Sequence, residues 1–88
     1  MRVVELTDTF RRTRAIRARL GSREDLALRS ALRRLASERH PLPDPRDREA
    51  FRTPMGSCWM RAITGTALVV HYTWSPPVVR ILAVDVAR

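Results

Sequence analysis

Apolar positions in the last third of the chain recur with the two-residue period of β-strands. Runs at residues 59–64, 66–74 and 78–86 are rich in β-branched and aromatic side chains, and turn-forming residues separate them at Gly65 and at 75–77. Three such segments joined by short turns predict an antiparallel β-meander at the C-terminal end of the chain.

The N-terminal part begins with a short strand pattern at residues 3–6 and then changes to the 3.6-residue period of a helix. The apolar positions of this first helix are Phe10, Ile16 and Leu20, and arginines occupy its other sides. Gly21 is a natural C-terminal stop. The pattern therefore predicts a basic amphipathic helix that ends at Gly21.

A second helix is expected to begin directly after this stop, because Ser22 and Asp25 have the spacing of a capping box. Its apolar stripe consists of Leu26, Leu28, Ala31, Leu32 and Leu35, and His40-Pro41 ends it. Almost nothing separates the two helices, so they are predicted to form an antiparallel hairpin. The proline-rich segment 41–45 reads as an extended connector, and 50–53 is a candidate short strand.

The expected architecture is one α+β domain over residues 1–88, in which an N-terminal strand and a helix hairpin pack on the C-terminal meander. A three-residue turn at 75–77 would place Tyr72 opposite Arg80. The face then assigned to the core carries Leu68, Val70, Tyr72, Trp74, Leu82 and Val84. The opposite face is smaller and more polar, and it carries Ala67, Val69, His71, Thr73, Val79, Ile81, Ala83 and Asp85.

The more polar face is the expected working surface. We place Arg61 on it, beside Val69 and His71, because an unpaired arginine in the core would be very costly. Arg80 is expected near one end of the apolar face, from which its side chain reaches past the rim.

The charge of the chain is carried on arginine alone. All 17 basic residues are arginines, and residues 10–39 hold ten of them against three acidic residues. The guanidinium group stays charged and suits phosphate, so this bias favours an acidic partner, most commonly nucleic acid. The candidate nucleic-acid contacts are Arg11, Arg14, Arg33, Arg52 and Arg88. A GC-rich genome is the alternative explanation for the absence of lysine, and a solvated face is the alternative interpretation of the helix arginines.

The sequence lacks the residue patterns of several other classes of protein. Cys58 is the single cysteine, so no internal disulfide can form and a cytoplasmic protein is expected. Cys58, His40 and His71 lack the spacing of metal ligands, so no metal is predicted. There is no glycine-rich phosphate loop, hence no expected cofactor, and no apolar run approaches the length of a membrane span.

One activity implied by the family resemblance described next is cleavage of RNA without a metal ion. In that reaction a base removes the proton of a 2′-hydroxyl, and cationic groups stabilise the charge that builds up on the phosphate. His71 is the candidate base or acid, and Arg61 and Arg80 are the candidate catalytic cations. Asp85 is expected roughly 13 Å from His71, too far to form a dyad. The alternative interpretation is that His71 has a structural role and takes no part in catalysis.

Three segments resemble the RelE/ParE toxins of bacterial type II toxin–antitoxin systems. They are residues 56–63 (GSCWMRAI), 68–72 (LVVHY) and 78–84 (VVRILAV). The order of strand, helix hairpin and meander resembles that family as well. The resemblance implies a RelE/ParE-like fold and a cognate antitoxin as partner. It implies one of two activities, which are cleavage of mRNA in the ribosome and poisoning of DNA gyrase.

The sequence therefore predicts a toxin that acts as a ribosome-dependent mRNA endonuclease and is neutralised by its antitoxin. Two alternatives remain open. One is a non-enzymatic ParE-like toxin that binds gyrase, or a degenerate relative that only binds its antitoxin. The other is a plain basic module that binds nucleic acid.

Overall fold

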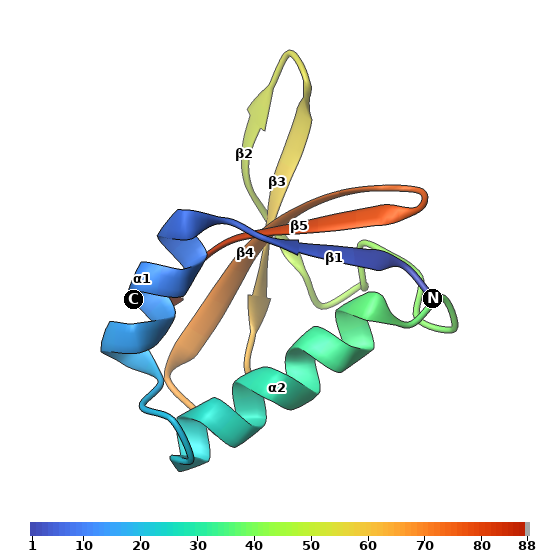
Figure 1. The fold of residues 1–88 in the computed structure, drawn as a ribbon. Coiled ribbons are helices and arrows are strands. Elements are labelled where there is room, and N and C mark those ends of the chain that lie inside the picture. Colours follow the sequence, from blue (N-terminus) through green and yellow to red (C-terminus); the bar gives the residue numbers. More distant parts are fainter. Residues whose placement is uncertain (88) are drawn as a thin grey trace.

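A computed structural model describes residues 1–87, which form a five-stranded mixed sheet and two helices (Figure 1). The elements are β1 (Val3–Leu6), α1 (Asp8–Arg17), α2 (Arg23–Ala36), β2 (Arg48–Thr53), β3 (Gly56–Ala62), β4 (Leu68–Ser75) and β5 (Val78–Val86). The strand order is β1-β5-β4-β3-β2, with β1 parallel to β5 and the other pairs antiparallel. The α+β class and the C-terminal meander are confirmed, and β1 and β2 extend the meander at its two edges.

Both helices begin at a side-chain cap. The Thr7 hydroxyl accepts a hydrogen bond from the Phe10 amide, and the Ser22 hydroxyl accepts one from the Asp25 amide. Each cap satisfies one of the amides that have no partner within the first turn of a helix. The cap predicted at Ser22 is therefore confirmed.

The expected helix hairpin is wrong in two respects. The helices do not lie along each other, because α1 packs against β5 while α2 runs away from the turn that joins them (Figure 1). The first helix ends at Arg17, and the side chains of Ile16 and Leu20 are 76% and 78% exposed. Only Phe10 of the predicted stripe is buried, because so short a helix covers the sheet with a single turn.

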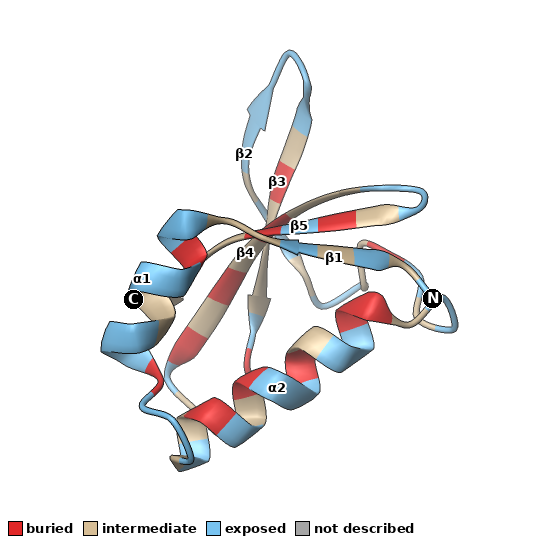
Figure 2. Cartoon of the chain, in the orientation of Figure 1, coloured by how far each residue is buried: buried red, intermediate tan, exposed pale blue. Residues whose placement is uncertain are grey.

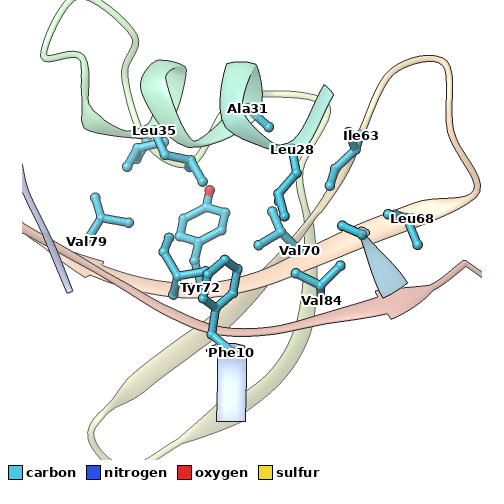
Figure 3. Close-up of a cluster of buried hydrophobic side chains, with 13 residues drawn as sticks. Phe10, Leu28, Ala31, Leu35, Ile63, Leu68, Val70, Tyr72, Val79 and Val84 are labelled. Carbon is cyan, nitrogen blue, oxygen red and sulfur yellow. The ribbon is translucent and has the colours of Figure 1, made fainter. Parts of the chain in front are cut away.

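The hydrophobic core lies between the helices and one face of the sheet (Figure 2). Phe10 enters it from α1, and Leu28, Ala31 and Leu35 enter it from α2. The sheet contributes Leu68, Val70, Tyr72, Val79, Ile81 and Val84. Figure 3 shows the Tyr72 ring at the centre of this cluster, with its hydroxyl directed toward α2. Full burial of a side chain of this size stabilises a fold by about 1.5–3 kcal/mol relative to exposure.

The register of β4 and β5 differs from the expected one. The turn has two residues, so Ser75 pairs with Val78 and Tyr72 pairs with Ile81, not with Arg80. A bulge between His71 and Tyr72 then restores the expected direction for Val84.

This change of register exchanges side chains between the two faces of the sheet. Val79 and Ile81 are buried in the core, and Leu82 is only partly buried. Arg80 lies opposite Thr73 and therefore on the face that the helices leave uncovered. A shift of one residue has this effect because alternate residues of a strand point to opposite faces.

The turn between the helices is organised around the buried carboxylate of Asp25. It accepts a hydrogen bond from the Gly21 amide at 3.0 Å and forms ion pairs with Arg14 at 3.0 Å and Arg29 at 3.1 Å. The hydrogen bond from Gly21, followed by that from Arg14, holds the pKa of Asp25 below its ordinary value despite the burial of the carboxyl group. Arg14, a predicted nucleic-acid contact, is therefore engaged in joining α1 to α2.

The lowered pKa of Asp25 predicts how acid affects stability. A group with a lower pKa in the folded state stabilises the fold above its unfolded pKa, and this contribution is lost as the pH falls through the folded pKa. The gap in unfolding free energy between wild type and Asp25→Asn should therefore be largest at neutral pH and shrink below about pH 4. Urea denaturation at several pH values measures it. A gap that is equal at pH 7 and pH 3 would contradict this role.

Candidate functional site

The face of the sheet opposite the helices carries a hollow of about 540 Å³. We call this face, which includes His71, Thr73 and Arg80, the open face. Arg46, Arg48, Met60, Val69, His71 and Asp85 are among the residues that line its hollow. The hollow therefore combines an imidazole, two guanidinium groups and one carboxylate on an apolar floor.

The sheet register places these side chains in one row. Arg48 at the start of β2 pairs with Met60 of β3, Met60 pairs with His71 of β4, and His71 pairs with Ala83 of β5. Directly paired residues of neighbouring antiparallel strands project to the same face. Arg48 and His71 are therefore separated only by the Met60 side chain, and both side chains face the hollow.

Asp85 lies closer to His71 than the sequence suggested. The partner of His71 is Ala83 and not Ile81, so Asp85 is only two residues beyond it and lies opposite Val69. Diagonal positions of this kind are roughly 7–8 Å apart. Asp85 also forms a long ion pair with Arg17, at 3.8 Å. The expected separation of about 13 Å was wrong because it rested on the wrong register.

Arg61, predicted on the working surface, lies on the opposite face of the sheet. It pairs with Val70 and therefore projects toward the helices. The expectation failed because it assumed that Arg61 would be unpaired there. Its Nε and Nη2 atoms both donate to the Asp47 carboxylate at 2.9 Å, and the two side chains are 11% and 1% exposed. The connector before β2 thus supplies the counter-charge.

Tyr72 completes this group, which we call the Asp47 cluster: Asp47, Arg61 and Tyr72. The tyrosine hydroxyl donates to Asp47 Oδ2, and the Arg61 guanidinium lies 5.8 Å from the centre of the ring. Burial, and then the neighbouring Asp47 carboxylate, raise the pKa of Tyr72. Burial would lower the pKa of Arg61, but the hydrogen bonds and charge of Asp47 outweigh it and raise that pKa.

Arg80, the third predicted catalytic residue, shares the open face with His71 but does not line the hollow. Its Nε atom lies 3.2 Å from Glu5 of the neighbouring strand β1, and its side chain is 57% exposed. The structure therefore brings His71 and Arg80 to one face and separates both from Arg61.

The predicted nucleic-acid contacts are dispersed. Arg11 and Arg52 are exposed and paired with the nearby acids Asp8 and Glu49, each at 3.3 Å. Arg33 is exposed on α2 and donates to the Ser30 hydroxyl. Arg88 lies outside the described residues. None of the contacts predicted within residues 1–87 lines the hollow on the open face.

Sequence reasoning missed Arg46 and Arg48, which supply the two guanidinium groups of this hollow. The candidate strand was taken to begin at residue 50, whereas β2 begins at Arg48. A signal was present in the segment Asp44 to Asp47. The Asp44 carboxylate accepts from the Arg46 amide, and the Asp47 amide donates to the Asp44 carbonyl, so a turn fixes the approach to the strand.

Residues 1–87 contain no group of three or more His, Cys, Asp and Glu side chains arranged to hold a metal ion. Within the same residues, neither helix is long and apolar enough to span a membrane. Comparison of the chain with family models, curated proteins and solved structures finds no match.

Substitutions on the two faces should lower stability by different amounts. Arg61→Ala leaves the buried Asp47 carboxylate without its partner and should lower the free energy of unfolding by about 3–5 kcal/mol. His71→Ala should lower it by about 1 kcal/mol or less, because the imidazole is only partly buried. Chemical denaturation of both variants measures the difference.

A double variant, Asp47→Asn with Arg61→Gln, serves as the control because it removes both charges together. It should be less destabilised than Arg61→Ala alone, since no uncompensated charge stays buried. Equal stability of Arg61→Ala and His71→Ala would show that the Asp47 cluster does not hold the fold together.

Proposed function

We propose that the chain is a RelE/ParE-like toxin that cuts mRNA on the ribosome and is neutralised by a cognate antitoxin. The target and the partner come from the resemblance of its sequence segments to that family. The order of its elements supports the resemblance, because one strand and two helices precede the antiparallel meander.

The observation that carries the proposal is the hollow on the open face, which His71 lines together with Arg46 and Arg48. An RNA phosphate seated there meets cationic groups and an imidazole, and a histidine can exchange protons near neutral pH. His71 removes the proton from the 2′-hydroxyl, whose oxygen attacks the adjacent phosphorus while the 5′-oxygen leaves. The arginines stabilise the additional negative charge of the transition state.

The roles of the predicted catalytic residues change accordingly. Arg46 and Arg48 supply the positive charge that the sequence assigned to Arg61, and Met60 lies between Arg48 and His71. Arg61 supports the fold from the other face, and Arg80 contacts a more distant phosphate. Asp85 is close enough along the neighbouring strand to bias the orientation of the imidazole.

A second candidate is a toxin that binds its target without cleaving it, as a ParE-like protein binds gyrase. One observation favours it. His71 is the only histidine that lines the hollow, and the Asp85 carboxylate is shared with Arg17, so proton donation to the leaving oxygen has no second dedicated group.

Induced expression in a bacterial host tests the nuclease proposal. The wild-type chain should arrest growth, and primer extension should show cuts in translated mRNA. His71→Ala should reduce cleavage by about 10²–10⁴-fold, the usual contribution of a general acid or base. Arg12→Ala, which removes an exposed arginine far from the hollow, is the matched control and should leave cleavage unchanged.

The other outcomes separate the alternatives. Cleavage that survives His71→Ala combined with Arg48→Ala would refute the assigned site. Growth arrest with inhibited supercoiling and uncut mRNA would support the gyrase-binding reading. Normal growth on induction, together with salt-sensitive binding to any nucleic acid, would support the remaining alternative, a basic module that binds nucleic acid.

A further inference from the structure

A second hollow, of about 530 Å³, lies on the other side of the sheet between α2 and β3. We call it the edge hollow. Ser30, Ala31 and Arg34 form its wall on α2, and Arg61 and Thr64 lie on the opposite side. It lies at the end of β3 where β2 no longer pairs with that strand: β2 reaches only Met60, and Arg61 and Ala62 pair with β4 alone.

The edge hollow shares two lining residues with the hollow on the open face. Arg46 and Ala62 line both of them. Arg46 belongs to the connector that leads into β2, so its exposed side chain stands where the two faces of the sheet meet. A single strand that bends around the sheet edge beside Arg46 would contact the lining of both hollows.

A third, smaller hollow of about 310 Å³ lies against the C-terminal half of α2. It shares Ser30 and Arg34 with the edge hollow and adds Arg33, Ser37 and His40. The three hollows thus form a single series in which each is joined to the next by shared residues.

The series is basic along its whole length. Its lining includes Arg33, Arg34, Arg46, Arg48 and Arg61 against the two acidic residues Asp47 and Asp85. Arg61 and Asp47 neutralise each other, and Asp85 in the hollow of the open face is ion-paired with Arg17. Cationic groups that follow a groove, with hydroxyl groups between them, suit the phosphates of a single strand.

We propose that the three hollows form one track for single-stranded RNA, which runs from the cleavage position at His71 past Arg46 to Arg33 and Arg34 on α2. The choice of RNA rests on the proposed function. The track adds to that function a binding region outside the catalytic hollow, and it predicts that affinity increases with the length of the strand.

The test is binding of uncleavable, 2′-O-methylated oligonucleotides of two lengths, about 4 and about 12 nucleotides, within the range of site sizes of single-strand binding proteins. Affinity is measured by fluorescence anisotropy over a series of salt concentrations. The variant is Arg33→Ala with Arg34→Ala. The matched control is Arg12→Ala with Arg19→Ala, which removes the same charge from exposed positions outside all three hollows.

With the long strand, the slope of log K against log salt should be less steep for the track variant by about 1.4. The variant loses two phosphate contacts, and each contact on a single strand contributes about 0.7 to the slope. The short strand, seated in the catalytic hollow, should bind wild type and track variant equally. The control variant should retain the wild-type salt dependence with both strands.

Three results would overturn the track. Equal losses in the track and control variants would indicate diffuse attraction between charges. Full binding of the long strand by the track variant, with cleavage still dependent on His71, would refute the track and leave the proposed function intact. A glutamate-rich peptide of equal charge that binds more tightly than RNA, and loses affinity in the track variant, would identify the series as a protein interface.

A different experimental result would refute the proposed function itself. A wild-type chain that binds neither oligonucleotide at any salt concentration would refute RNA as the ligand of both the catalytic hollow and the track.

Discussion

The fold depends on one buried carboxylate, that of Asp47, which interacts with two side chains at once. Asp47 receives both the guanidinium of Arg61 and the hydroxyl of Tyr72, on the face of the sheet that the helices cover. Without this counter-charge Arg61 could not occupy a core-facing position, because an unpaired buried charge is strongly destabilising. The same contact holds the connector against β3 and so places Arg46 at the sheet edge and Arg48 at the start of β2. The Asp47 cluster therefore organises both sides of the sheet.

This arrangement divides the arginines into two groups with different tasks. Arg14 and Arg61 compensate the buried carboxylates Asp25 and Asp47, and each ties together segments that are distant in the sequence. Arg46 and Arg48 are exposed and line the hollow that also contains His71. A high arginine content thus serves stability at some positions and leaves a cationic surface at others, and the exposure of the side chain distinguishes the two.

Local patterns predicted most of the elements but not their long-range pairing. The strands at 3–6 and 78–86 and the cap at Ser22 follow from side-chain periodicity and capping chemistry, which act within a few residues. The two-residue turn and the bulge beside His71 left no comparable signal, and they decide which side chains face the core. The partner of Arg61 lies 14 residues away in a connector, so burial of that arginine could not be read from its own strand. Of the predicted catalytic residues, His71 was placed on the correct face, whereas Arg61 and Arg80 were each assigned to the wrong one.

The central proposal is that the chain binds RNA on the open face of its sheet and not through the arginine-bearing surface of α1. The most direct measurement is the change in backbone amide NMR shifts of the isotope-labelled chain when a short 2′-O-methylated RNA is added. The account predicts that the largest shifts occur at Arg48, Met60 and His71, whose side chains share one row across three strands. Shifts confined to α1, or no shifts at any RNA concentration, would contradict it.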